Sequence, residues 1–143
     1  MKSKDLNMTA RQVYLYKPIS LESKDIRLLH LLPGKWEEDI QCQLEVIGLE
    51  KHPVYEALSY AWGDPKVVRP ILLDGEQMNV TINLESALRH LRFPGSTRIL
   101  WVDALCIDQK TAVEKTHQVG MMDEIYKQCF RVIIWLDISP IST

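Results

Sequence analysis

The stretch Arg98-Ile-Leu-Trp-Val-Asp-Ala-Leu-Cys-Ile-Asp-Gln109 decides the fold prediction for this chain. Residues 99–102 are all apolar and do not alternate with polar residues, which is typical of a central strand buried on both faces of an α/β sheet. Asp103 follows directly, and Asp108 and Gln109 come soon after it. In open α/β sheets, ligands bind beyond the carboxyl ends of the strands. These three polar residues are therefore the first candidates for a functional site.

The rest of the sequence predicts an α/β fold with a mixed sheet. The expected strands are residues 26–32, 41–49, 55–61, 98–104 and 131–136, and the expected helices are residues 83–92, with Asn83 as the N-cap, and 111–129. Asp74-Gly75 between apolar flanks predicts an inserted hairpin with a two-residue type I′ turn. The last strand, helix and strand form a β-α-β unit, so strands 98–104 and 131–136 should be parallel, adjacent and buried.

Length and composition bound the class of protein. The 143 residues suit one domain, which we place at 21–143 after an N-terminal arm at 1–20. A net charge of −2 gives no electrostatic reason to expect nucleic acid or an anionic membrane as a partner. The three cysteines show no CxxC spacing, the N-terminus has no apolar signal region, and no stretch approaches the roughly 18 apolar residues of a membrane span. We therefore expect a soluble, cytoplasmic protein with reduced thiols.

Helix 111–129 should bring polar side chains to the end of strand 98–104. Its apolar stripe continues toward the helix N-terminus through Gln118 and Glu114, at helical spacing. In a β-α unit this end of the helix lies beside the carboxyl end of the preceding strand, so Asp103, Glu114 and Gln118 should share one cleft. Trp62, beside Gly63 at another strand end, is either a core aromatic or part of a pocket in that cleft.

Each of these polar residues also has a purely structural interpretation. Thr111 and Glu114 fit a capping box, in which the glutamate bonds to the backbone of the cap residue. Asp103 could accept backbone N–H bonds in a tight loop, and Asp108 and Gln109 are typical turn residues. Two nearby carboxylates, Asp103 and Glu114, could instead serve as acid and base if their pKa values differ. The histidines and cysteines do not have metal-ligand spacing, so no metal site is expected.

The chain resembles the HET (heterokaryon incompatibility) domain of filamentous fungi. The matching blocks, in the order of that family, are Tyr55–Asp64, Asn83–Arg92, Leu100–Gln109, and Glu114 to Val119 with the following residues up to Leu136. The motif or ligand-binding candidates within them are Tyr60, Trp62, Gly63, Asp108, Gln109 and Gln118. The resemblance covers about residues 26–137 and implies a role in fungal nonself recognition, in which incompatible cell fusion triggers programmed cell death.

The resemblance also implies a fold like that of TIR domains, a flavodoxin-like arrangement, and three hypotheses for function. The first is a death-signalling module that acts by self-association or by contact with another HET-domain or recognition protein. The second is an NAD-cleaving enzyme, with NAD as substrate and Asp103 or Glu114 in the role of the glutamate that TIR enzymes carry on a later helix. The third is a truncated family member that regulates longer ones by competing for their interfaces.

Overall fold

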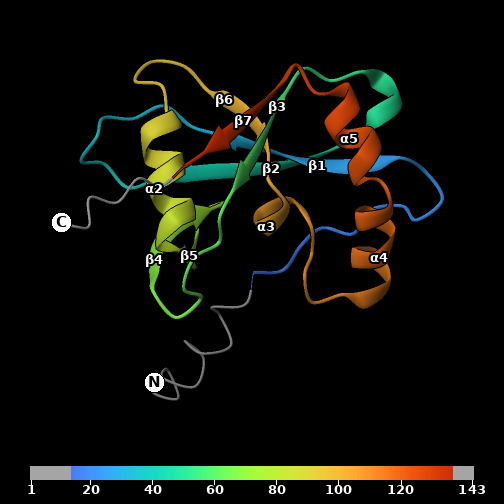
Figure 1. Cartoon of the computed structure of the whole chain (residues 1–143), viewed down its shortest axis with the longest axis horizontal. Helices are drawn as coiled ribbons and strands as arrows, with labels where there is room; N and C mark the ends of the chain where they lie inside the picture. The colour runs from blue at the N-terminus through green and yellow to red at the C-terminus, as the bar shows by residue number, and fades with distance from the viewer. Residues whose placement is uncertain (1–13, 137–143) are drawn as a thin grey trace.

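Residues 14–136, which the computed structural model describes, form a seven-stranded mixed sheet flanked by helices (Figure 1). The strands are β1 (Asp25–Leu31), β2 (Gln41–Gly48), β3 (Glu56–Tyr60), β4 (Val68–Leu73), β5 (Glu76–Thr81), β6 (Arg98–Trp101) and β7 (Arg131–Trp135). The helices are η1 (Leu49–Lys51), α2 (Ile82–Leu91), α3 (Asp103–Cys106), α4 (Ala112–Gly120) and α5 (Met122–Gln128). The order of strands in the sheet is β5-β4-β2-β1-β6-β3-β7, which confirms the α/β class.

One part of the sheet is parallel, and the rest is built from the N-terminal strands and an inserted hairpin. β3 is parallel to β6 and to β7, whereas β1 is antiparallel to β2 and β6. β4 and β5 form the antiparallel hairpin, in which Leu73 faces Glu76. Asp74 and Gly75 in its turn have φ values of 51° and 81°, as a type I′ turn requires. The hairpin prediction is confirmed.

The prediction that strands 98–104 and 131–136 are adjacent is wrong. β6 and β7 are parallel members of one sheet, but β3 lies between them, with Glu56 in register with both Leu100 and Arg131. The crossover through α4 and α5 therefore passes β3 before the chain returns as β7. A local apolar pattern predicts that a strand is formed, but it does not predict which strand pairs with it. Here β3 pairs with β6 on one side and with β7 on the other.

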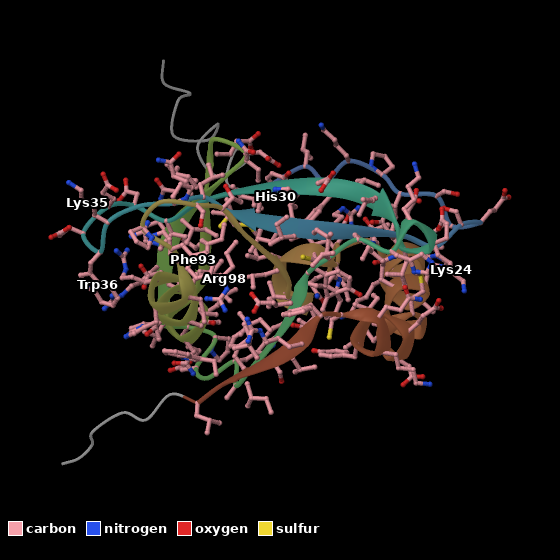
Figure 2. All side chains as sticks on the ribbon, turned by 90° about the horizontal axis from the view of Figure 1, so that it is seen from above. Lys24, His30, Lys35, Trp36, Phe93 and Arg98 are labelled. Atoms are coloured by element: carbon pink, nitrogen blue, oxygen red, sulfur yellow. The ribbon has the colours of Figure 1, made fainter. Side chains whose placement is uncertain are left out.

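The two long helical regions cover opposite faces of the sheet. Arg98 donates a hydrogen bond to the carbonyl of Leu91 in α2, whereas the Trp101 ring contacts the ring of Tyr126 in α5. Arg98 and Trp101 are an odd number of positions apart in β6, so their side chains point to opposite faces. α2 stands beside the β4–β5 hairpin, and α4 and α5 stand at the other end of the sheet (Figure 1). Figure 2 labels Trp36 at the α2 end and Lys24 at the α4–α5 end.

The predicted strand 98–104 and helix 111–129 are both shorter than expected. Ile99 to Val102 pack in the core as predicted, with Leu100, Trp101 and Val102 fully buried, but the strand ends at Trp101 and Asp103 begins the short helix α3. The long helix is broken at Met121, which has φ −96° and ψ −3° and donates its N–H to the carbonyl of Gln118. This tighter bonding ends α4, and α5 begins in a new direction. Among the described residues, no helix has both the length and the apolar character needed to cross a membrane.

Strand β7 is an exposed edge of the sheet, although the sequence predicted a buried strand. Val132 and Ile134 are 44% and 69% exposed, while Trp135 on the other face packs against His90 of α2. An apolar run has the same appearance whether its strand is central or at an edge, because burial depends on what lies beside and over it. The helices α4 and α5 cover β6 and the start of β3, and they leave this face of β7 open.

The described part of the expected N-terminal arm packs against the domain. The hydroxyl of Tyr16 donates to the carbonyl of Leu105 at 2.9 Å, and the carbonyl of Lys17 accepts a bond from Arg27 at 2.8 Å. Ile19 is buried. Residues 14–20 are thus joined to the domain predicted at 21–143, and residues 1–13 of the arm lie outside the described residues.

A buried carboxylate joins the parallel strands at their amino ends. Glu56 of β3 accepts hydrogen bonds from Arg98 of β6, at 2.7 and 3.2 Å, and from Arg131 of β7, at 2.7 Å. The Arg98 guanidinium also lies over the ring of Phe93, 4.6 Å from its centroid (Figure 2). The hydrogen bonds from Arg98, and then those from Arg131, lower the pKa of the Glu56 carboxyl, although burial opposes this shift. The ionised carboxylate is therefore the form that the fold stabilises.

Replacing this carboxylate should weaken the fold in a pH-dependent manner. We expect Glu56→Gln to lower the free energy of unfolding at neutral pH by about 1–3 kcal/mol, because charge-assisted bonds to two arginines are lost. The folded pKa of Glu56 lies below its ordinary value of 4.5, so its contribution is complete above that pH and disappears as the pH falls through the folded pKa. Urea denaturation of both proteins across this range should show curves that converge in acid. A difference that stays constant with pH would contradict this account.

Candidate functional site

The topology of the sheet predicts a ligand site at the carboxyl ends of β3 and β6, a region that we call the crevice. The chain leaves β3 toward α2 and leaves β6 toward α4 and α5, and these helices lie on opposite faces. Adjacent parallel strands with connections to opposite faces create a crevice between their ends. Tyr60 and Trp62 stand at the end of β3, with ring planes 5° apart and centroids separated by 6.5 Å. Trp62 is 46% exposed, so it lies at the surface and not in the core.

Asp103 stands at the matching end of β6. Burial raises the pKa of its carboxyl above the ordinary value, while hydrogen bonds with the backbone N–H groups of residues 103 and 104 act in the opposite direction. The charge of Asp103 in turn adds to the effect of burial in raising the pKa values of the Tyr60 and Tyr126 hydroxyls. Backbone hydrogen bonding is therefore part of the role of Asp103, and its charge also acts on two phenols from different elements.

The turn after β3 is fixed by contact with the start of α2. Gly63 has φ +73°, and a Cβ atom placed on it would lie 2.6 Å from the Nδ2 atom of Asn83. The same Nδ2 atom donates to the carbonyl of Ala61 at 3.0 Å. Asn83 was expected to cap α2, but the N-cap is Thr81, whose hydroxyl accepts a bond from the N–H of Leu84. Asn83 lies inside the first turn of α2 and uses its amide to hold the loop that carries Trp62.

Glu114 lies in a buried ion pair with Arg27 of β1. The Glu114 side chain is 10% exposed and the Arg27 side chain is 1% exposed. The capping-box prediction is wrong, since the side chain of the N-cap residue Thr111 makes no capping bond and the Glu114 carboxylate is occupied by Arg27. The Thr111 hydroxyl donates to Asp108 instead. A glutamate three residues after a threonine fits a capping box by spacing alone, but a buried guanidinium is a stronger partner than one backbone N–H.

Gln118 is also bound to β1. It is fully buried, and its Nε2 atom donates to the carbonyl of Asp25 at 3.0 Å. Its Oε1 atom is buried and has no hydrogen-bond partner among the described residues. Glu114 and Gln118 thus lie on the inward face of α4, as the helical stripe predicted. Their polar atoms bind β1, so the structure does not bring them together with Asp103 in one cleft.

Asp108 and Gln109 shape the loop between α3 and α4. Asp108 accepts bonds from the N–H of Lys110 at 3.1 Å and from the hydroxyl of Thr111 at 2.7 Å. Gln109 donates its Nε2 proton to the carbonyl of Asp103 at 3.0 Å. This supports the interpretation of both as turn residues. They also line a cavity of about 280 Å³ with Tyr14, Tyr16, Gln77, Met78, Asn79, Ala104 and Lys110.

The residue that sequence reasoning missed is Arg27. Its Nη1 atom donates to the carbonyl of Cys106, and its Nη2 atom donates to Lys17 and to Glu114. The signal was present, because a lone arginine interrupts the apolar run Ile26-Arg-Leu-Leu, and a charge buried in a strand needs a partner. The identity of that partner, which is far away in sequence, could not be inferred from the run.

The described residues offer no group of three or more His, Cys, Asp or Glu side chains arranged to hold a metal ion. Cys42 and Cys106 are buried, and burial raises the pKa of each thiol to about 12. Such thiols are neutral near pH 7 and poor nucleophiles. The groups placed at the ends of β3 and β6 include the Asp103 carboxyl, the Tyr60 and Trp62 rings and the amide of Asn83.

Comparison with known proteins assigns a family to this arrangement. Residues 55–140 match the family described as Heterokaryon incompatibility protein (HET). The chain belongs to the HET family. It is also 32% identical over 145 residues to the Heterokaryon incompatibility protein 6, OR allele, of Neurospora crassa, in an alignment that covers 90% of this chain. The chain spans about a fifth of the length of that relative, 21%. No solved structure matches the chain.

The HET match contains every element around the crevice. It begins at Tyr55, whose hydroxyl donates to the carbonyl of Ile125 at 2.6 Å, and it includes β3, α2, β6, α3 and β7. The first block of the resemblance forms β3 and the Trp62 turn, and the second block supplies Asn83, which holds that turn. The third block supplies the buried strand and Asp103. The blocks that stand apart in the sequence of this HET domain therefore meet at one edge of the sheet.

Adding one methyl group to the turn tests its geometry. Gly63→Ala should lower the free energy of unfolding by at least about 1–2 kcal/mol, because a positive φ disfavours any residue with a Cβ atom. The close approach of Asn83 adds to this cost. Gly95→Ala is the matched control, since its Cβ atom would meet nothing within 4 Å and its φ is not positive. Equal urea midpoints for the two variants would contradict the proposed strain.

The two carboxylates should respond in opposite ways to neutralisation. We expect Glu114→Gln to lower the free energy of unfolding by about 3 kcal/mol or more, because it leaves the buried charge of Arg27 uncompensated. Asp103→Asn should leave stability unchanged or raise it at neutral pH, because the raised pKa of Asp103 shows that its ionised form opposes folding. Urea denaturation measures both. A nearly silent Glu114→Gln would restore the capping interpretation, in which Gln serves as well as Glu.

Proposed function

We propose that this HET domain promotes heterokaryon incompatibility in the cytoplasm, by triggering death of fused cells through self-association or contact with a recognition partner. The observation that carries the proposal is the exposed apolar edge at β7, where Val132 and Ile134 are open to solvent. Exposed apolar side chains that adjoin one another mark sites of protein–protein contact. The family and the relative described by the words heterokaryon incompatibility supply the biological setting.

The separation of Asp103 from Glu114, the candidate acid–base pair, supports a contact mechanism over catalysis. Acid–base catalysis by two carboxyl groups needs both of them at the reacting atoms, with different pKa values. Glu114 is bound to Arg27 on the side of β1, so it does not share a site with the Asp103 carboxyl. The buried guanidinium of Arg27 needs the Glu114 carboxylate as its partner. Movement of Glu114 to a catalytic site would therefore destabilise the fold.

Cleavage of NAD is the second candidate function, and one observation favours it. The Asp103 carboxyl with its raised pKa stands near Tyr60, whose ring is parallel to that of Trp62. Flat aromatic rings suit the nicotinamide and adenine rings of NAD, and a carboxyl group with a raised pKa can exchange a proton with a substrate. This candidate makes Asp103 the catalytic residue and NAD the substrate.

Two measurements on one variant separate the two functions. If the domain acts by contact, Asp103→Asn should still cause cell death on overexpression in a fungal host, at the level of the unchanged protein and with equal accumulation. The purified proteins should then release no nicotinamide from NAD beyond the buffer control. Asp108→Asn is a suitable control, because its bonds to Lys110 and Thr111 serve the loop.

The opposite pattern would favour the enzyme. Loss of cell death in Asp103→Asn, together with nicotinamide release by the unchanged protein and none by the variant, would replace contact by NAD cleavage. Loss of cell death without any nicotinamide release would place Asp103 in the contact surface itself.

A further inference from the structure

An apolar stripe runs along the outer strand of the sheet. Four side chains at alternate positions are exposed by 67%, 44%, 69% and 68%, and they are Phe130, Val132, Ile134 and Leu136. Side chains two positions apart in an extended strand point to the same face. We name these four residues the β7 stripe: Val132 and Ile134 lie on the open face of β7, and Phe130 and Leu136 flank the strand. The strand that carries it follows the outer margin of the ribbon in Figure 2, away from β1 and β2.

The stripe coincides with an unpaired strand edge. Within the described residues 14–136, β7 pairs with β3 on one side and no strand pairs with its other side. The opposite edge of the sheet, β5, carries Glu76, Gln77 and Asn79, polar residues of the kind that blunt an edge against further pairing. In β7 the single charged residue is Arg131. The two edges are thus protected differently, and β7 is the one suited to receive another strand.

We propose that β7 pairs with β7 of a second copy of this chain, in antiparallel orientation, about a two-fold axis at Ile133. The inference rests on the proposed function, and it names the partner and surface through which self-association would occur. The pairing joins two seven-stranded sheets into one continuous sheet. It satisfies the outer backbone groups of both β7 strands by strand addition, with the main chain supplying affinity and the side chains specificity.

The sequence of the strand is self-complementary in this register. With Ile133 on the axis, Val132 faces Ile134 of the second copy, and Phe130 faces its Leu136. Every member of the β7 stripe therefore meets another apolar side chain, and cross-strand pairs of this kind stabilise a sheet. An isologous interface of this type closes as a dimer and does not propagate.

Charge favours the antiparallel over the parallel arrangement. Arg131 faces the indole ring of Trp135 of the second copy when the strands run in opposite directions. In a parallel pairing in register, each Arg131 would lie beside its own equivalent, and directly opposed like charges destabilise a sheet. The Arg131 guanidinium is already held by Glu56 and lies over the ring of Phe130, so it is positioned beside the strand.

Sedimentation of the purified full chain tests the interface. We expect the unchanged protein to form a concentration-dependent dimer and Ile134→Lys to raise the dissociation constant by at least about tenfold, because a charge is placed in an apolar contact. Val113→Lys is the matched control, since Val113 of α4 is 64% exposed but lies outside the stripe. All three proteins should give the same circular dichroism spectrum, because the substituted side chains are exposed. Their urea midpoints should agree at concentrations below the dissociation constant, where no dimer adds to the stability of the folded state.

Complementation of two variants tests the register. Val132→Glu should also weaken the dimer when measured alone. Mixed with Ile134→Lys, it should recover a heterodimer, because the two-fold register sets the glutamate of one copy against the lysine of the other. The second contact in that heterodimer is the native pair of Ile134 and Val132. Addition of salt should weaken the heterodimer more than the unchanged dimer.

Each result bears on the proposal in one direction. A monomeric unchanged protein at every concentration, or a dimer insensitive to Ile134→Lys, would overturn the interface. Failure of the mixed variants to associate would overturn the two-fold register. The cell-death assay distinguishes this inference from the proposed function: a dimeric protein that kills no cells refutes the function alone. A monomeric Ile134→Lys that kills as well as the unchanged protein refutes the link between dimer and death.

Discussion

The guanidinium of Arg27 is the constraint on which the arrangement of this domain depends. It is 1% exposed, and it joins segments that are distant in the sequence: the carbonyl of Lys17, the carbonyl of Cys106 and the carboxylate of Glu114. The ring of Tyr16 lies against it, 4.7 Å from the guanidinium carbon. A charge removed from water is tolerated only with such partners. The N-terminal segment, α3 and the start of α4 are therefore each fixed relative to β1 by one side chain.

This constraint determines which residues remain for function. Glu114 compensates the buried charge, and Gln118 bonds to the backbone of β1 one helical turn further along, so the inward face of α4 is devoted to attachment. Because α4 is held in this way, the chain between β6 and α4 must form the compact loop in which Gln109 bonds to Asp103. Glu114 and Gln118 therefore lie apart from the Asp103 carboxyl, and the amide of Asn83 holds the turn at Trp62.

Local physics accounts for what the sequence could predict. The buried strand at β6, the turn at Asp74-Gly75 and the inward stripe of α4 each depend on residues within a few positions of one another. The prediction was wrong where a distant partner decides the outcome. Glu114 fits a cap by spacing, but it pairs with Arg27, which is 87 positions away. In the same way, the strand order β6-β3-β7 depends on pairings that no local pattern encodes.

β6 and β7 differ in their surroundings although their sequences are similarly apolar. Both strands contain a run of large apolar residues, yet β6 has strands on both sides and helices on both faces, whereas β7 has one neighbouring strand in the described residues and an open face. An exposed apolar edge strand lowers solubility and can pair with a strand of another chain. The other edge strand of this sheet, β5, carries polar residues. Pairing of two β7 strands, as proposed above, would cover these apolar side chains. We therefore place the proposed contact between two copies at the outer edge of β7, where the apolar side chains lie, and not at the carboxyl ends of β3 and β6.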